Sequence, residues 1–447
     1  MEMATRMSFF SSIACAFALL SGCTVAEVEA AGGHEKFRIS CFSFNKPAHT
    51  RQHVFEAKEC GLNSVGGGIY PDERELMDSL HEAGIGTSVC WLPRVCGSRF
   101  STAELRQRHP RESLEAKLDE LSAKFRHPAI KYMNISDEPG VHAMEYLGDV
   151  VRLMNEKSPW VIPYINLYPN YAQASESEES VKKSQLGTTS YKKYIEDYCR
   201  LVPTTMISFD HYPIMATPEK TRKFSPRWYG NLKVVADACR RTGREMWVGP
   251  QANSRPKCAP ISENSLRFQA FSAMAFGAVD LTWACWTMGW WDNNIMETNG
   301  TLTCQYQKLK TVNAEVLAFE PVYMRLRNVA THFIGFRGEE EALAKYEIVP
   351  VERLGAAGFG ELAATDGSSL VVGEMEPRGG NSAVRGLFVF GANDCGDEKG
   401  ETHEIAFAAK GAIRAFGPGG AVAVKRLGDG RFSVSLRDND ALLLLSK

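Results

Sequence analysis

The chain has 447 residues, of which 44% are hydrophobic and 23% are charged, a composition typical of a globular protein. This length accommodates one large domain of roughly 250 to 300 residues and a smaller second domain. The chain carries 51 Lys and Arg residues against 53 Asp and Glu residues, a formal charge of -2. Because there is no basic excess, the composition speaks against a nucleic-acid-binding protein, and we expect no nucleic-acid partner.

The first 22 residues (1–22) have the layout of a secretory signal peptide. Arg6 precedes an apolar run over 7–20 that is too short to span a bilayer comfortably. The run ends in "LSGC", which resembles the lipobox of bacterial lipoproteins; a plain signal peptide with a chance cysteine is the alternative. The resemblance implies cleavage before Cys23, lipidation of that residue and a linker over 23–36. We therefore expect an exported protein held at the membrane by its N-terminal lipid, facing the periplasm or the cell surface.

Twelve cysteines are present, two of them in the signal region. Disulfides persist in the compartment expected for an exported protein, but a single sequence does not reveal which cysteines pair. No CxxC motif and no Cys/His cluster with zinc spacing occurs in the sequence. We therefore expect no metal site and no cofactor.

Short apolar runs alternate with amphipathic segments from residue 37 onward. The eight runs cover 37–45, 61–70, 84–93, 129–139, 160–169, 205–214, 245–252 and 279–288. Helix-like segments between them include 71–83, 110–125 and 225–242, and the first and third of these are apolar at i, i+3, i+4 and i+7. Strands that alternate with helices predict a parallel sheet with right-handed crossovers. Eight such units predict a closed (β/α)8 barrel, the TIM-barrel fold, over 37–335.

An open doubly wound sheet is the alternative architecture. Such a sheet normally carries a glycine-rich phosphate-binding turn after its first strand, whereas "SFNKPAHT" (43–50) contains no glycine. After about residue 335 the pattern changes to short alternating runs separated by "DG", "GG" and "ND", which predicts antiparallel strands joined by tight turns. We therefore expect a small antiparallel β-sandwich over 338–447 that braces the barrel; a sugar-binding sandwich is the alternative.

Polar residues near the end of the fourth predicted strand are the first candidates for function. Successive side chains of a strand point to opposite sides, so the segment 132–138 divides into two sets. The more apolar set, expected to face the surrounding helices, is Met133, Ile135 and Asp137. The set expected to face the barrel axis is Tyr132, Asn134, Ser136 and Glu138. Glu138 then lies at the C-terminal mouth, where (β/α)8 active sites are built; a carboxylate that favours the next helix dipole is the alternative.

Further strand-end residues are expected at the same mouth. They are Asn166 and Tyr168 on the fifth strand, Asp210, His211 and Tyr212 on the sixth, and Gln251 on the seventh. For the sixth strand, a plain turn before Pro213 is the alternative. The eighth strand and its loop contain Trp283, Trp286, Trp290 and Trp291, followed by Asp292. We expect Trp283 in the core, whereas Trp290 and Trp291 adjoin Gly289 and "DNN", which is typical of a loop.

These features resemble the large clan of (β/α)8 retaining glycoside hydrolases, which includes β-galactosidases and cellulases. The resemblance covers about 38–335 and rests on architecture and on the motif "DEP". In that clan an Asn-Glu pair ends strand four and the Glu is the acid/base. Glu138 matches the Glu, and Asp137 stands in place of the Asn. The resemblance implies a glycosidase with a carbohydrate substrate and with Glu138 as general acid.

The resemblance also implies sugar-binding roles for the other residues at the mouth. The expected substrate-binding residues are Asn166, Tyr168, His211, Tyr212, Gln251, Trp286, Trp290, Trp291 and Asp292. Amide and hydroxyl groups are suited to sugar hydroxyls, and flat aromatic rings on a loop are suited to stacking against sugar rings. Core packing is the alternative for the tryptophans.

One position departs from the clan, whose nucleophile is a Glu ending strand seven, where this chain has Gln251. Three carboxylates are candidates for the partner of Glu138. Asp210 lies two strands away, which suits the separation of about 6.5 to 9.5 Å found in inverting enzymes. Asp137 beside Glu138 resembles the Asp-Glu pair of substrate-assisted N-acetylhexosaminidases, although strand parity points Asp137 away unless the strand twists before Pro139. Asp292, reaching across the mouth, is the third.

Two other function classes compete with the hydrolase. A carbohydrate-binding barrel that has lost catalysis is favoured by the Gln251 departure. A metal-dependent barrel hydrolase is less favoured, because such sites gather several His and Asp residues and His211 is the only histidine expected at a strand end.

Overall fold

The computed structural model describes residues 36–97, 100–175, 177, 180, 183–216, 222–224, 226–287, 292–379, 383–393 and 400–447. The predicted signal peptide, Cys23 and the loop tryptophans Trp290 and Trp291 therefore lie outside the described residues. None of the helices in the described ranges combines the length and the apolar character that a membrane span requires.

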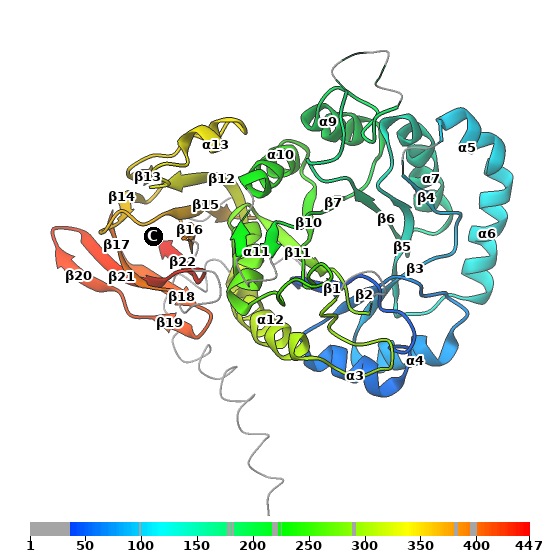
Figure 1. Ribbon diagram of the computed structural model, residues 1–447, viewed down its shortest axis with the longest axis horizontal. Helices are drawn as coiled ribbons and strands as arrows, with labels where there is room; N and C mark the ends of the chain where they lie inside the picture. Colours follow the sequence, from blue (N-terminus) through cyan, green and yellow to red (C-terminus); the bar gives the residue numbers. More distant parts are fainter. Residues whose placement is uncertain are drawn as a thin grey trace, which may run out of the picture.

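Eight parallel strands form the large domain (Figure 1). They are β1 (Arg38–Cys41), β2 (Ser64–Gly66), β3 (Gly86–Val89), β5 (Ile130–Asp137), β6 (Ile162–Leu167), β7 (Met206–Asp210), β10 (Glu245–Gly249) and β11 (Ala278–Trp283). The strands pair in chain order from β2 to β11, and β11 pairs with β1. Backbone hydrogen bonds from Asn63 N to Ile39 O and from Phe44 N to Gly66 O, each 3.0 Å, cross the remaining seam. The predicted (β/α)8 barrel is confirmed, and each of the eight predicted runs overlaps one of its strands.

Helices surround the barrel (Figure 1). They are α3 (Arg51–Glu59), α4 (Arg74–Ala83), α5 (Thr102–Arg108), α6 (Arg111–Lys124), α7 (Met144–Lys157), α9 (Tyr191–Leu201), α10 (Pro226–Thr242), α11 (Glu263–Ala275) and α12 (Cys304–Tyr323), with a 3-10 turn η1 (Val141–Ala143). Helix α4 shows why the periodic segments fold this way: Leu76, Met77 and Leu80 are buried on one face, as the i, i+3, i+4 spacing requires. Short strands β4 (Val95–Cys96), β8 (Ile214–Ala216) and β9 (Arg222–Phe224) lie in the loops that follow barrel strands.

The C-terminal part consists of two antiparallel sheets and one short helix, α13 (Glu340–Ala344). The six-stranded sheet contains β12 (Leu326–Ile334), β15 (Leu370–Pro377), β16 (Arg385–Gly391), β18 (Ile413–Gly417), β19 (Gly420–Val422) and β22 (Ala441–Ser446). The five-stranded sheet contains β13 (Leu354–Ala356), β14 (Phe359–Ala364), β17 (Thr402–Ala409), β20 (Lys425–Gly428) and β21 (Arg431–Arg437). Strand β12 falls within the range 37–335 that the sequence pattern assigns to the barrel, yet it pairs antiparallel with β15.

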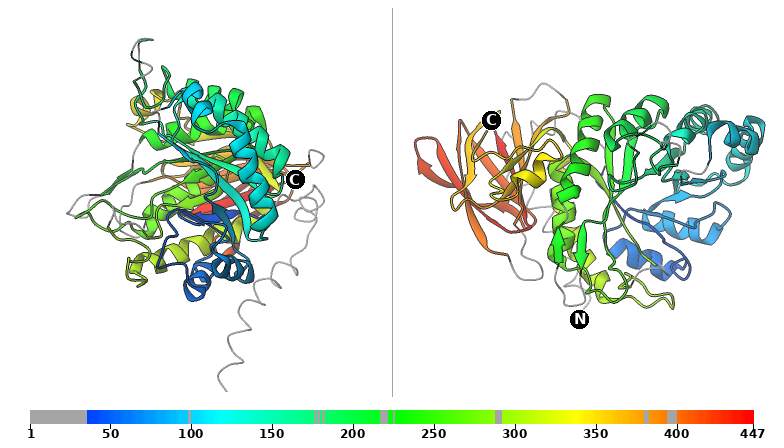
Figure 2. Two further views of the ribbon diagram at one scale, coloured as in Figure 1. Left: turned by 90° about the vertical axis from the view of Figure 1, so that its right-hand side faces the viewer. Right: turned by 45° about the horizontal axis from the view of Figure 1, so that its top comes forward.

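The central strands β16 and β22 of the six-stranded sheet are buried on both faces. Along β16, Val389 belongs to the core between the two sheets, whereas its neighbours Phe388 and Phe390 pack into the barrel core. The ring of Phe388 lies 5.2 Å from Phe319 of α12, between ring centroids. The right-hand view of Figure 2 shows the sheet seated beside the helices α10 to α12. Two buried faces explain why β22 reads as an unbroken apolar run rather than an alternating one.

Candidate active site

A cavity of about 380 Å³ lies at the C-terminal mouth of the barrel. Its wall includes the ends of β1, β2, β3, β5, β6 and β7, together with Glu138 just after β5 and Tyr212 just after β7. Three carboxylic acids line it, Asp137, Glu138 and Asp210, together with Asn166 and Tyr212. The five residues come from three adjacent strands, so the barrel gathers groups that are up to 75 positions apart in the sequence into one site.

A β-bulge in β5 changes which side chains face this cavity. In the pairing of β5 with β6, Asn134 lies opposite Tyr164, but the next partner of Ile165 is Ser136, so Ile135 is an extra residue. An extra residue breaks the alternation of a strand. Asn134 and Asp137 therefore both line the cavity. The expectation that Ser136 faces inward and Asp137 outward is wrong: the Ser136 hydroxyl donates to Val95 O of β4 at 2.8 Å.

Glu138 follows directly with a left-handed backbone, φ 51°, a conformation that is uncommon for residues other than glycine. Its amide donates to Asn166 O at 2.8 Å, which ties this turn to the end of β6. The turn brings Glu138 onto the same cavity as Asp137. Burial, and then the charges of Asp210 and Asp137, raise the pKa of Glu138 to about 8. The carboxyl is therefore mostly protonated at neutral pH.

Asn166 connects the two other acids. Its Nδ2 donates to Asp210 Oδ1 at 2.7 Å and to Asp137 Oδ1 at 3.2 Å. Burial raises the pKa of Asp210 to about 6, while hydrogen bonds from Asn166 and Tyr212 favour its charged form. A single amide group thus fixes the spacing of Asp137 and Asp210. At neutral pH the Asp210 carboxyl is mostly ionised, whereas the Glu138 carboxyl mostly holds its proton.

The site contains groups that sequence reasoning did not single out. Arg94, in the loop after β3, lies on the cavity wall and approaches Asp137 with Nη2 to Oδ2 at 3.5 Å. Tyr171 is 44% exposed. Burial of its phenol is the main cause of its raised pKa, and the nearby charges of Asp210 and Glu138 raise it further. Both follow a predicted strand closely, which is the one signal that the sequence offered for them.

Three residues expected at the mouth lie behind its wall and do not line the cavity. Tyr168 is buried against Tyr194, with ring centroids 6.4 Å apart. His211 lies 3.0 Å from Asn231 through Nδ1, and burial lowers the pKa of its imidazole to about 4. The Gln251 side chain accepts from Ile214 N at 3.1 Å and donates to Asn253 O at 3.0 Å. Both ends of its amide group are therefore hydrogen-bonded to backbone groups.

The eighth strand and its loop also differ from the expectation in part. Trp283 is core, as predicted, and Trp286 is core as well, with no exposed surface and its ring 5.8 Å from that of Phe44. Asp292 is exposed and accepts a hydrogen bond from Lys257 N at 3.0 Å, and it does not line the cavity. Over the described ranges, no three His, Cys, Asp or Glu side chains are grouped as metal ligands.

The chain matches no family model, and no curated protein matches it in sequence. Its fold is similar to that of the β-galactosidase from Bacillus circulans sp. alkalophilus, with a TM-score of 0.54, 9% identity and coverage of 92% of this chain and 99% of that chain. It is similar to a glycoside hydrolase family 5 protein from Bacteroides vulgatus, with a TM-score of 0.53, 10% identity and coverage of 92% and 89%. These likenesses agree with the barrel and C-terminal sheets described above.

A weaker likeness is to the β-galactosidase from the psychrophilic Marinomonas ef1, with a TM-score of 0.44, 11% identity and coverage of 63% of this chain. This chain spans 60% of the length of that enzyme. At such identities the likenesses concern the fold, and the chemistry has to be argued from the residues of the site.

Proposed function

We propose that this protein is a glycoside hydrolase in which Glu138 protonates the oxygen of the leaving group. The observation that carries the proposal is a protonated acid on the same cavity as an ionised one: the pKa of Glu138 is raised to about 8, whereas that of Asp210 is about 6. Asp137 lines the same cavity. Glycoside hydrolysis uses such a pair, one carboxyl as acid and one as base or nucleophile. Solved structures with the same fold are glycosidases, which supports a carbohydrate substrate.

Asp210 is the proposed second carboxylate. In this scheme the Asp210 carboxylate accepts a proton from water as the water oxygen bonds to the anomeric carbon. At the same time the glycosidic bond breaks and the proton of Glu138 passes to the departing oxygen. Asn166 and Tyr212 hold Asp210 by hydrogen bonds, so the base keeps its orientation. The product would have the inverted anomeric configuration.

A substrate-assisted N-acetylhexosaminidase is the second candidate, and the β5 bulge favours it. The bulge brings Asp137 onto the cavity directly beside Glu138. In this scheme Asp137 accepts a hydrogen bond from the N–H of the substrate's acetamido group, whose oxygen attacks the anomeric carbon while Glu138 protonates the leaving oxygen. Water then opens the cyclic intermediate, and the anomeric configuration is retained.

Product stereochemistry separates the two schemes. Aryl glycosides of neutral hexoses and of N-acetylhexosamines are offered to the wild-type protein, and the first-formed anomer is followed by NMR. Inversion, with Asp210→Asn far more damaging than Asp137→Asn, supports the Asp210 scheme. Retention restricted to 2-acetamido substrates, with Asp137→Asn the damaging change, supports the substrate-assisted scheme. Sugar binding without turnover of any glycoside would replace both by the binding-protein class.

Export and lipid anchoring at Cys23 belong to the same proposal. The sequence "LSGC" and the apolar run before it are the support. A Cys23→Ser variant expressed in a bacterium should lose the incorporation of labelled fatty acid and leave the membrane fraction, whereas a Cys15→Ser variant should behave as the wild type. Equal membrane association of all three proteins would contradict lipidation at Cys23.

A further inference from the structure

A second large cavity, of about 400 Å³, lies at the opposite end of the barrel. Its wall is formed by Glu245 and Met246, which open β10, by the start of β12 and by the end of β15. It therefore lies where the barrel base meets the six-stranded sheet. Four arginines line it, Arg240, Arg244, Arg327 and Arg378, and we refer to it as the arginine cavity.

Two of the four guanidinium groups are paired with carboxylates. Arg327 donates through Nε to Glu376 at 2.8 Å, and Arg240 forms an ion pair with Asp237. Glu245 is the other acid on the wall, and its Oε2 accepts from Trp247 Nε1 at 3.0 Å.

The other two, Arg244 and Arg378, donate to backbone carbonyls instead. Arg244 Nη2 donates to Cys199 O and Val202 O, each at 2.9 Å. Arg378 Nε donates to Met324 O at 3.2 Å. Within the part of the chain that the structure describes, neither has a carboxylate at ion-pair distance. Counting Asp237, the partner of Arg240, four cations face three carboxylates, which leaves the cavity with a surplus of one positive charge.

The surplus of positive charge in the arginine cavity is electrostatically unfavourable, and a bound anion would offset it. Arg378 is partly buried, and burial lowers the pKa of its guanidinium although the charges of Tyr323 and Glu245 act to raise it. Guanidinium groups present several N–H donors in a planar fork that matches carboxylate, sulfate and phosphate oxygens. The volume is within the range of small-molecule sites.

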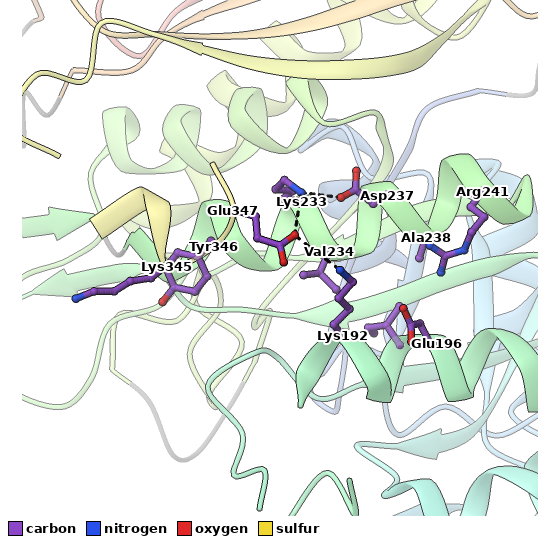
Figure 3. Close-up of a pocket in the computed structure, with 11 residues that line it drawn as sticks. Lys192, Glu196, Lys233, Val234, Asp237, Ala238, Arg241, Lys345, Tyr346 and Glu347 are labelled. Atoms are coloured by element: carbon purple, nitrogen blue, oxygen red, sulfur yellow. Dashed lines mark hydrogen bonds and ion pairs between the residues drawn. The ribbon is translucent and has the colours of Figure 1, made fainter. Parts of the chain in front are cut away.

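A pocket of about 180 Å³ between α9, α10 and α13 offers a comparison, because two of its lysines are paired with carboxylates (Figure 3). There Lys233 lies 2.9 Å from Asp237, and Glu347 is shared by Lys233 and Lys192 at 4.0 and 3.7 Å. The two lysines therefore have carboxylate partners in place. This pocket supplies a matched control for the arginine cavity.

We propose that the arginine cavity binds a small oxyanion, namely a carboxylate, sulfate or phosphate group, at a site separate from the active site. The group is either a free inorganic anion or the charged substituent of an acidic sugar. Arg378 and Arg244 are the residues that carry the binding, because their charges lack carboxylate partners. The proposal does not depend on the glycosidase assignment, since it concerns other residues at the other end of the barrel.

Isothermal titration of the whole protein with sulfate, phosphate, glucuronate and glucose tests this, at an ionic strength held constant with sodium chloride. We expect saturable binding of the anions and none of glucose. Arg378→Gln should weaken the binding by about tenfold or more, Arg378→Lys should give an intermediate loss, and the control Lys192→Gln should bind as the wild type. Binding should persist in Glu138→Gln, so a failed glycosidase assignment would leave this result intact.

Thermal unfolding supplies a second readout that does not need the ligand. Removing a cation from a crowded cavity should raise the melting temperature of ligand-free Arg378→Gln at low ionic strength, and sulfate should stabilise this variant less than it stabilises Lys192→Gln. The comparison between variants is needed because sulfate stabilises most proteins non-specifically. Absence of saturable anion binding by the wild type, or equal binding by Arg378→Gln, would overturn the proposal.

Discussion

At the scale of single residues, the candidate site keeps two carboxylic acids in different protonation states. Among the described residues, no hydrogen bond stabilises the charged form of Glu138, and burial is the main cause of its raised pKa. Asp210 is also buried, but Asn166 and Tyr212 donate to it and hold its pKa near 6. The environment of each carboxyl, rather than its residue type, separates the proposed acid from the proposed base. A site of this kind can supply both an acid and a base at neutral pH.

The pH dependence of kcat/KM should therefore be bell-shaped. Asp210 must lose its proton to act as base, so the rate should rise through a pH of about 6, and Glu138 must keep its proton, so the rate should fall through a pH of about 8. Asp137→Asn removes one of the negative charges that raise the pKa of Glu138, so its alkaline limb should move to lower pH. A flat profile between pH 5 and pH 9 would contradict these roles.

The same raised pKa predicts how stability depends on pH. Because the folded state holds the Glu138 proton more tightly than the unfolded state, the stabilising contribution is present at low pH. It is lost as the pH rises from 4.5 through about 8. Glu138→Gln cannot lose this contribution, so the variant should exceed the wild type by about 1 to 3 kcal/mol at pH 9 and by little at pH 4.5. Urea titrations at both pH values measure the difference, and a difference that does not grow with pH would count against a buried, protonated Glu138.

At the scale of elements, the packing of β10 against β7 positions Asp210. Gly249 of β10 has no room for a side chain, because a Cβ there would lie 2.9 Å from Asp210 Cβ and 3.1 Å from Phe42 Cε2. Its conformation is not the reason, since its φ is not in the left-handed region. The close approach of the two strands therefore sets where the second carboxylate lies.

Gly249→Ala should displace Asp210 and lower kcat by at least about tenfold, while overpacking costs about 1 to 3 kcal/mol of stability. Gly355→Ala is a suitable control, because nothing lies within 4 Å of the Cβ it introduces. Activity assays and thermal melts of both variants provide the comparison. Full activity in Gly249→Ala would show that the position of Asp210 does not matter to the reaction.

The strands also show which features of the fold and of the site can be predicted from the sequence. Apolar runs that alternate with amphipathic segments locate all eight barrel strands, because strands of a buried parallel sheet are apolar on both faces. The bulge at Ile135 leaves no such trace, since an apolar residue there suits a regular strand equally well. Parity alone therefore assigned Asp137 to the outer face. Gln251 shows the converse: a polar strand-end residue turned out to satisfy backbone groups.

At the scale of the whole molecule, the six-stranded sheet contributes side chains to two hydrophobic cores, one shared with the barrel helices and one between the two C-terminal sheets. Phe388 is fully buried and lies among Phe271, Phe319 and Tyr323 of the barrel helices. The arginine cavity lies along the same junction and combines residues from 236 to 378. Neither feature could be predicted from local patterns, because both depend on how the second domain docks onto the first.

Phe388→Ala should destabilise the barrel itself, by about 3 to 5 kcal/mol. All eight tryptophans lie between positions 91 and 291, so tryptophan fluorescence reports on the barrel alone. Its denaturation midpoint should fall in Phe388→Ala. In Phe407→Ala, which changes the five-stranded sheet, the midpoint should fall less. An unchanged fluorescence midpoint in Phe388→Ala would mean that the two domains unfold independently.

The central claim, that Glu138 donates the proton to a departing glycosidic oxygen, is tested most directly by varying the leaving group. Aryl glycosides with phenols of decreasing acidity are hydrolysed by the wild type and by Glu138→Gln. We predict a loss of about 100- to 10,000-fold for poor leaving groups and little loss for dinitrophenolate, which departs without a proton. An equal loss for every leaving group, or no hydrolysis of any glycoside by the wild type, would contradict the claim.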